Sequence, residues 1–345
     1  MIPPSNHRIV WATGELNNWA ERRFGLDPSN LIWVMPAEGY LTDPKRPRTD
    51  HGSSTMRESE ILQIIRAHIP GTGDDAAVVP FQDTNLVLTT DMLHRLSDFP
   101  EGTTPMTIGW RSVAVSLSDL AAMGARPLGV LLAFGDPDLD ERCVTGVLEG
   151  ATACCETAKT RLLGGDLDRH QELTLVSTAI GHARDPVLRC GAKVGDLLCV
   201  TGELGRTQAA LHCFATELTE RANDLFCFPP RIAWGYLLAK VANSMIDISD
   251  GLARSLHLLA GESGVGCAIE EARLPVSPAL REHLPQERWF DALLFGGEDY
   301  ELLFTLPESA ISAIDRAVRY SVIGRVTEGG VLLDGNELPD RGYDH

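Results

Sequence analysis

Apolar and polar positions follow one another in short, regular runs from about residue 56 onward. Residues 57–68 place Ile61, Leu62, Ile64 and Ile65 on one side of a helix, because residues three or four apart share a face. Further strands are expected at 76–79, 86–90, 128–134, 161–163, 173–180, 197–201 and 301–305, and further helices at 106–123, 138–157, 206–217, 231–243 and from Gly251 onward. Strands that alternate with helices and then pair with one another predict an α/β (α+β) fold with mixed sheets and flanking helices.

Composition divides the chain into three parts. Residues 1–55 hold half of the tryptophans, and their six basic and six acidic side chains cancel, so the net charge of −18 belongs to residues 56–345. The polar, Pro-rich stretch 43–55 predicts a linker. We therefore expect residues 1–55 to be a leader, either loosely ordered or the product of a mis-assigned start. A break between 181 and 195 predicts an N-terminal domain at 56–185 and a C-terminal α/β domain at 186–345.

Charge and cysteine usage narrow the class of protein. A charge of −18 argues against nucleic acid or an anionic membrane as the main partner. No apolar run reaches the roughly 20 residues that span a bilayer, and the N-terminus lacks the apolar core of a signal peptide. The eight cysteines form no C-x-x-C pair, so a zinc site is not expected. Reduced thiols and a cytoplasmic protein are predicted.

Aspartates in turns rich in Gly, Ser or Thr are the candidate chemistry. They border apolar runs and are Asp74, Asp75, Asp91, Asp119, Asp166, Asp247 and Asp250. Each alone is most simply a turn former or a helix cap. Converging carboxylates repel one another unless cations neutralise them, and oxygen ligands suit Mg²⁺, which usually accompanies phosphate. Because the chain has no G-x-x-x-x-G-K-[ST] loop, Mg²⁺ would do more of the phosphate binding, and a Mg-nucleotide enzyme is predicted.

Six motifs occur in a fixed order: GDDA (73–76), TTD (89–91), LSDLAAMGA (117–125), GGD (164–166), DISDGL (247–252) and GGEDYEL (296–302). As an ordered set they resemble the thiamine-monophosphate kinase family, which belongs to the same superfamily as aminoimidazole ribonucleotide synthetase. The resemblance covers residues 56–345, and residues 90–94, 98–100 and 165–168 look most like the archaeal branch.

The resemblance implies two α/β domains like those of aminoimidazole ribonucleotide synthetase. It implies a homodimer paired through the N-terminal domains, with ATP and several Mg²⁺ ions in a cleft formed mainly by that domain. The implied reaction moves a phosphoryl group from ATP to thiamine monophosphate, giving thiamine diphosphate. Since the acceptor phosphate is already ionised near neutral pH, no catalytic base is expected, and transfer depends on position and metal charge.

The resemblance also assigns residues to roles. Implied metal ligands are Asp74, Thr89, Thr90, Asp91, Asp119, Asp166, Asp247 and Asp250. Implied ATP contacts are Gly165, Asp166, Arg189 and Ser249, and implied substrate contacts are Asp98, Glu298, Asp299 and Tyr343. Asp98 stands where the family commonly has a His, which leaves the acceptor pocket open. Simpler roles stay open as well: Ser249 as a cap of the next helix, Arg189 as a linker arginine, Glu298 and Asp299 as a turn, Tyr343 as packing, and Asp75 as a partner that orients a ligand.

Two alternatives to this kinase activity remain at this point. The first keeps the Mg-ATP site but uses a different small-molecule acceptor, as other members of the superfamily do. The second is a nucleotide- or metal-binding protein without catalysis.

Overall fold

The computed structural model describes residues 64–65, 67–69 and 72–343. The chain divides into two units, 1–55 and 56–345, and the description concerns only the second. The predicted leader and most of the predicted helix at 57–68 therefore lie outside the described residues, although the described residues 64–65 and 67–68 are helical.

The first half forms a mixed five-stranded sheet in the order β1-β2-β5-β3-β4. The strands are β1 (Ala77–Phe81), β2 (Thr84–His94), β3 (Arg126–Asp136), β4 (Leu162–Arg169) and β5 (Thr174–Ala183). Only the β3–β4 pair in this sheet is parallel. The predicted strands are present but longer than expected, so Asp91 and Asp166 lie within β2 and β4 rather than beyond their ends.

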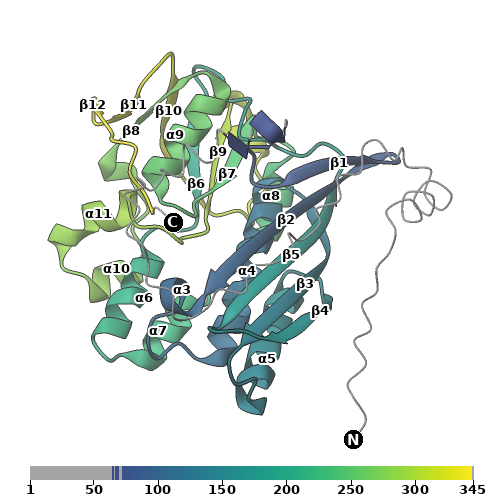
Figure 1. The fold of residues 1–345 in the computed structure, drawn as a ribbon. Coiled ribbons are helices and arrows are strands. Elements are labelled where there is room, and N and C mark those ends of the chain that lie inside the picture. The colour runs from purple at the N-terminus through teal and green to yellow at the C-terminus, as the bar shows by residue number, and fades with distance from the viewer. Residues whose placement is uncertain (1–63, 66, 70–71, 344–345) are drawn as a thin grey trace, which may run out of the picture. The chain divides into compact units, whose positions relative to one another are not determined.

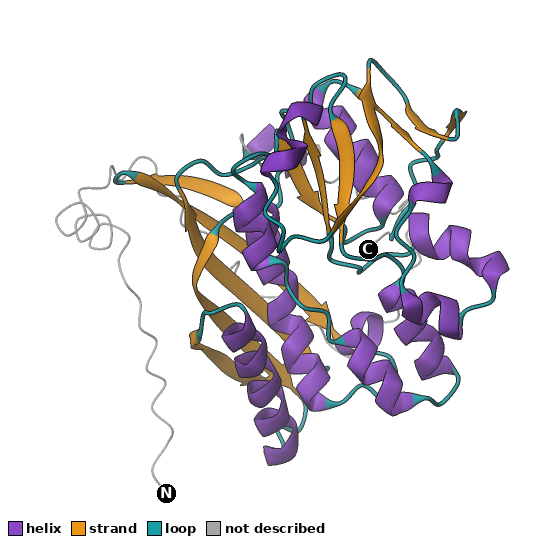
Figure 2. Ribbon diagram, turned by 180° about the vertical axis from the view of Figure 1, so that it is seen from behind, coloured by secondary structure: helices purple, strands orange, loops and turns teal. Residues whose placement is uncertain are grey.

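Two helices, α4 (Pro105–Ala122) and α5 (Glu141–Thr157), cover one face of this sheet (Figure 2). A short helix, α3 (Arg95–Asp98), follows β2. In α4, 14 of the 18 residues are buried, which is the pattern of a helix enclosed on all sides rather than an amphipathic one. The helix begins after Thr104, whose hydroxyl accepts from Thr107 N, and Pro105 takes the first-turn position where no N–H is needed.

Glycines let α4 and α5 approach closely. A Cβ on Gly150 would lie 1.9 Å from Met106 O, and a Cβ on Gly109 would lie 1.9 Å from Val147 O. We expect Gly150→Ala to lower the free energy of unfolding by about 2 kcal/mol, because the helices must separate to admit a methyl group. Gly261→Ala is the matched control, since nothing lies within 4 Å of its Cβ position on a helix; it should be neutral or stabilise by up to about 1 kcal/mol. Urea denaturation of both variants measures the difference, and equal stabilities would contradict the close approach.

The second half forms a seven-stranded mixed sheet in the order β12-β11-β8-β10-β6-β9-β7. Its strands are β6 (Leu197–Thr201), β7 (Ser244–Asp247), β8 (Gly266–Ile269), β9 (Leu302–Leu306), β10 (Tyr320–Thr327), β11 (Val331–Leu333) and β12 (Asn336–Glu337). Its helices are α6 (Arg206–Ala215), α7 (Thr219–Phe226), α8 (Ile232–Leu238), α9 (Leu252–Ser263), α10 (Pro278–His283) and α11 (Trp289–Leu294), with 3₁₀ turns η2 (Glu271–Arg273), η3 (Gln286–Arg288) and η4 (Glu308–Ala313). The prediction of β6 is confirmed to the residue. Elements of this half that were not predicted include the helices α7, α10 and α11 and the strands β7, β8, β10, β11 and β12.

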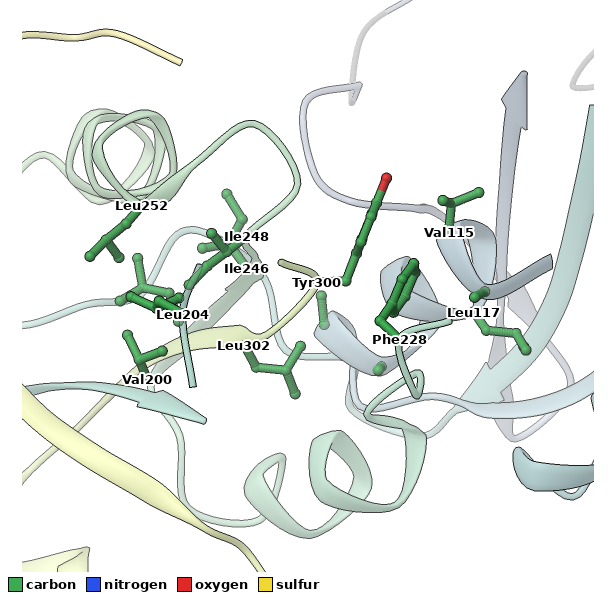
Figure 3. Packing of buried hydrophobic residues seen from close by; sticks show 14 of the residues in the cluster. Val115, Leu117, Val200, Leu204, Phe228, Ile246, Ile248, Leu252, Tyr300 and Leu302 are labelled. Carbon is green, nitrogen blue, oxygen red and sulfur yellow. The ribbon is translucent and has the colours of Figure 1, made fainter. Parts of the chain in front are cut away.

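Side chains of both halves pack into one core. Figure 3 shows Val115 and Leu117 of α4 near Phe228 and Tyr300, with Leu302 and other apolar residues of the second half continuing the cluster. The contact between the halves is close, because a Cβ on Gly235 of α8 would lie 2.0 Å from Ala121 O of α4. The helix that covers the first sheet thus also forms a wall of the second half.

The predicted division at 185/186 falls between β5 and β6, in the segment that joins the two sheets. The α/β fold class with two mixed sheets and flanking helices is confirmed. Within the described residues, no helix has both the length and the apolar character needed to cross a bilayer.

Candidate active site

Several of the predicted site residues meet at one small cavity between the halves. The cavity has a volume of about 160 Å³ and is lined by Asp91, Met92, Leu93, Asp98, Val115, Asp119, Ser249, Asp250, Glu298, Tyr300 and Tyr343. These lining residues include metal, ATP and substrate contacts predicted from sequence. Three larger hollows, of about 550 to 650 Å³, are lined by none of the predicted residues. The smaller cavity is therefore the candidate active site, because the predicted residues line it.

A group of three carboxylates lies at this junction. Asp75, Asp119 and Asp247 each offer an oxygen, and these oxygens lie within 4.8 Å of one another. Asp75 comes from the turn before β1, Asp119 from the last turns of α4 and Asp247 from the end of β7, so the fold joins three distant parts of the sequence. Asp75 Oδ2 is buried and has no hydrogen-bond partner among the described residues. An oxygen-only set of this kind, with one buried carboxylate oxygen left without a partner, fits a hard divalent cation.

The pKa values of these carboxyls are raised, as expected for crowded buried acids. Burial raises the pKa of Asp119 well above its usual range, and the charges of Asp91 and Asp247 raise it further. Burial and then the charge of Asp75 raise the pKa of Asp247 to about 8. Burial also raises the pKa of Asp91. At neutral pH the site therefore needs either protons or a cation.

Hydroxyl groups orient the carboxylates. Thr89 Oγ1 donates to Asp119 Oδ2 at 2.5 Å, because strand alternation places Thr89 on the face of β2 that α4 covers. In the same way, Ser116 Oγ donates to Asp91 Oδ2 at 2.5 Å and Ser118 Oγ donates to Asp247 Oδ2 at 2.6 Å. Such partners fix the direction of a ligand oxygen.

Arg189 binds the turn that carries Asp74 and Asp75. Its Nη2 donates to Asp75 Oδ1 at 2.7 Å, its Nη1 donates to Gly73 O at 3.0 Å, and its backbone N donates to Asp74 Oδ1 at 2.7 Å. Burial raises the pKa of Asp74. Arg189 is thus not a solvated linker arginine, and Asp75 rather than Asp74 is the member of the three-carboxylate group.

Gly165 and Asp166 do not reach the cavity within this chain. Asp166 is exposed on β4, and the strand register places it beside Ala133 on the sheet face that the helices leave open. Gly165 needs to be glycine for packing, because a Cβ there would lie 1.8 Å from Leu132 O. Thr90 also faces away from Asp119, and its hydroxyl donates to Ser177 O at 3.0 Å.

Three of the four predicted substrate residues line the cavity: Asp98, Glu298 and Tyr343. Asp98 is held in place, since its Oδ2 accepts from His94 N at 2.6 Å and from Ser97 Oγ at 2.7 Å. Asp299 does not line it. Its buried Oδ2 accepts from Gly205 N at 2.8 Å at the start of α6, and burial raises its pKa to about 7.

Ser249 lines the cavity, and its carbonyl oxygen accepts from Glu298 N at 2.5 Å. The alternative role of this serine as the cap of α9 is not observed. Gly251 is the N-cap of that helix, and no side chain makes a capping hydrogen bond there.

A buried arginine is among the residues near the site that were not singled out from sequence. Arg111 of α4 is completely buried and forms an ion pair with Glu298, with 2.6 Å between Nη2 and Oε1. The signal was present, because Arg111 is the one charged residue between positions 102 and 118, in a helix of apolar and small residues.

The fold and the site define a two-domain protein of the AIR synthase-related class. Residues 73–183 match the family model "AIR synthase related protein, N-terminal domain", and residues 193–333 match "AIR synthase related protein, C-terminal domain". Thiamine-monophosphate kinase of Halobacterium salinarum is 47% identical over 296 residues, covering 84% of this chain and 100% of the relative. That of Methanospirillum hungatei is 46% identical over 298 residues, covering 84% and 99%.

Among solved structures, AaThiL complexed with AMPPCP and TMP matches with a TM-score of 0.79 at 31% identity, covering 85% of this chain and 100% of that chain. The chain belongs to the thiamine-monophosphate kinase family.

Proposed function

We propose that this protein phosphorylates thiamine monophosphate to thiamine diphosphate, with ATP as the donor and several Mg²⁺ ions as cofactors. The observation that carries the proposal is the convergence, at one cavity, of Asp91, Asp119 and Asp250 with Glu298 and Tyr343. Asp119 also joins this cavity to the three-carboxylate group. The aspartate carboxylates suit a metal-bound phosphate, and Glu298 and Tyr343 suit a heteroaromatic acceptor.

Mg²⁺ would lower the repulsion between the phosphates of the donor and the acceptor. Asp75, Asp119 and Asp247 would hold it, with Asp91 and Asp250 at the same cavity. Hydroxyl donors on β2 and α4 orient three of these carboxylates, those of Asp119, Asp91 and Asp247. Because the acceptor oxygen is already ionised, the side chains need to bind and align rather than remove a proton.

The acceptor end of the cavity is formed by Glu298 and Tyr343. The Tyr343 ring is large enough to stack on a thiamine ring, and its backbone N donates to Asp250 O at 3.0 Å, which ties it to the metal side. Asp98 lies on the same cavity, so we assign it a place beside the acceptor.

Product identity tests the proposed function. The full chain and residues 56–345 are incubated with Mg-ATP and thiamine monophosphate, and thiamine diphosphate and ADP are quantified by HPLC, with free thiamine as a control acceptor. Equal amounts of both products from thiamine monophosphate, and none from thiamine, are expected. ATP binding without thiamine diphosphate would overturn the assignment and favour another acceptor at the same nucleotide site.

We further propose that the protein is a homodimer joined through the open face of the first sheet. This face carries apolar side chains in adjacent registered positions, namely Leu88, Met92, Leu131, Ala133, Val176 and Ile180. The helices that pack on this sheet, α4 and α5, lie on the other face (Figures 1 and 2). Unpartnered apolar sheet faces are characteristic of subunit interfaces.

Leu131→Glu is expected to convert the dimer to a monomer, because it places a charge in the middle of the open face. Leu148→Glu is the matched control, since Leu148 is an exposed leucine of α5 on the covered side of the sheet. Size-exclusion chromatography with light scattering measures the mass of each variant. A dimeric Leu131→Glu variant would move the interface elsewhere.

The dimer would give Gly165 and Asp166 a role at the site. Within one chain, β5 and β3 separate β4 from β2, and Asp166 lies on the face opposite Asp91 and Asp119. Asp166 of the partner subunit could instead reach the site, if the two subunits pair through the open faces of their first sheets.

Mixing Asp119→Asn and Asp166→Asn protein should then restore about a quarter of wild-type activity, because half of the dimers are mixed and each mixed dimer has one intact site. No recovery on mixing, with subunit exchange verified, would exclude a shared site.

We assign residues 56–185 to nucleotide and metal binding and dimerisation, and residues 186–345 to the second α/β domain. A cytoplasmic location is supported by the cysteines, all eight of which lie in the described part of the chain as free thiols.

A further inference from the structure

Arg111 is a buried charge that the reaction as proposed does not use. Its side chain is 0% exposed and does not line the cavity. Its Nη1 donates to Phe226 O at 3.0 Å, and its guanidinium carbon lies 3.6 Å from the centre of the Phe226 ring. Phe228 and Tyr300, stacked with ring centres 4.1 Å apart, complete the aromatic surroundings. A guanidinium so confined has few alternative positions.

The partner of Arg111 is Glu298, which does line the cavity. Arg111 Nη2 donates to Glu298 Oε1 at 2.6 Å, and the Glu298 side chain is 23% exposed. With Oε1 taken by the guanidinium, Oε2 is the oxygen that remains for a bound molecule. The pair therefore joins a buried cation of α4 to the acceptor side of the site.

The backbone at Glu298 is strained and is held from several sides. Glu298 has φ +69° and Tyr300 has φ +51°, in the left-handed region that residues with a side chain rarely adopt. Glu298 N donates to Ser249 O at 2.5 Å, and Thr207 Oγ1 donates to Glu298 O at 2.6 Å. Strain of this kind persists only where surrounding contacts over-determine it, and it clusters at functional sites.

The charge balance of the cavity gives the pair a second consequence. The lining includes the carboxyl groups of Asp91, Asp98, Asp119, Asp250 and Glu298, and no Lys, Arg or His is among its lining residues. Arg111 compensates Glu298 from behind the cavity wall. The guanidinium of Arg111 thereby balances the charge of Glu298 from within the protein.

We propose that Arg111 is a positioning residue for the acceptor substrate. It holds Glu298 in the conformation that directs Oε2 into the cavity, and it neutralises that carboxylate. Glu298 consequently acts as a hydrogen-bond acceptor for a donor group of the substrate, such as the amino group of an aminopyrimidine, rather than as the counter-ion of a cationic ring. The identity of the substrate in this inference rests on the proposed function.

A double-mutant cycle tests the inference on the full chain. Arg111→Met and Glu298→Gln should each raise the KM for thiamine monophosphate by about tenfold, which corresponds to about 1.4 kcal/mol, and leave the KM for ATP unchanged. The double variant should also show about a tenfold rise rather than about a hundredfold, because both changes remove the same interaction. Arg111→Lys should recover part of the loss, since it retains the charge but not the planar fork.

Other outcomes would overturn the proposal. A rise of about a hundredfold in the KM for thiamine monophosphate in the double variant would mean that the two residues act independently. A parallel rise in both KM values, with a lowered melting temperature in Arg111→Met alone, would mean that Arg111 only supports the fold. Glu298→Gln keeps the buried arginine and therefore remains measurable if Arg111→Met does not fold.

The proposed function and this inference can fail separately. Absence of thiamine diphosphate from wild-type protein would refute the function. A crystal structure of Arg111→Met or Arg111→Lys tests positioning without any substrate: a displaced Glu298 with a relaxed backbone is expected in Arg111→Met, and an unmoved Glu298 would refute the role of Arg111.

Discussion

Asp119→Asn is expected to lower the rate of phosphoryl transfer by about a thousandfold while the protein remains folded. Asp119 belongs to the group of three carboxylates and is the one among them that also lines the cavity. An amide has nearly the same shape but no charge, so the loss reports metal binding rather than packing. Initial rates of thiamine diphosphate formation at saturating Mg-ATP measure the effect.

The same variant should be more stable than wild type in the absence of metal. Removing one charge relieves repulsion by Asp91 and Asp247, the neighbours that raise the pKa of Asp119. Melting temperatures in EDTA and in Mg²⁺ are compared, with the exposed Asp138→Asn as the control for the loss of an ordinary surface carboxylate. Wild-type activity in Asp119→Asn would remove this residue from the metal site.

Without Mg²⁺, the melting temperature is expected to fall by about 5 °C between pH 5 and pH 8. Burial and the charge of Asp75 raise the pKa of Asp247 to about 8 from an ordinary value of 3.8. Between these values the folded state binds more protons than the unfolded chain. The stabilisation is therefore complete below about pH 4 and is lost as pH rises through about 8. Asp119 shifts in the same direction.

Saturating Mg²⁺ should remove most of this pH dependence, because the cation replaces the protons on the carboxylates. Stabilisation by Mg²⁺ should accordingly be larger at pH 8 than at pH 5. Asp299, whose pKa burial raises to about 7, contributes a similar trend that Mg²⁺ does not change. Asp247→Asn is the control, since it should lose the part of the dependence near pH 8. Equal Mg²⁺ effects at both pH values would argue against metal binding by this group.

Elements with strong local signals were predictable. The β6 segment LLCVT is an uninterrupted apolar run after a turn, and the structure buries all of its residues. The ends of β2 and β4 were not predictable in this way, because polar residues such as Asp91 and Asp166 continue the strands. Their backbone hydrogen bonds are decided by the neighbouring strands β5 and β3, which lie far away in sequence.

The candidate ligands could be identified from sequence, but which of them lie together in the folded protein could not. Asp74 and Asp75 are adjacent, and sequence offers no means of deciding which one faces Asp119. The structure decides for Asp75, because Arg189 N binds the Asp74 carboxylate and the Arg189 guanidinium takes one oxygen of Asp75. Asp299 looked equivalent to Glu298, yet it is directed to the start of α6.

The sequence by itself determined the family, the order of the motifs and the kinds of side chain available for metal, nucleotide and acceptor. These are local properties, and their spacing along the chain is sufficient to recognise them. Only the tertiary structure decided that Asp75, Asp119 and Asp247 meet, that Asp166 lies on the opposite face of the sheet, and that Arg111 holds Glu298. Such contacts join residues far apart in sequence, and they arise from the packing of α4 between the two sheets, which no local pattern encodes.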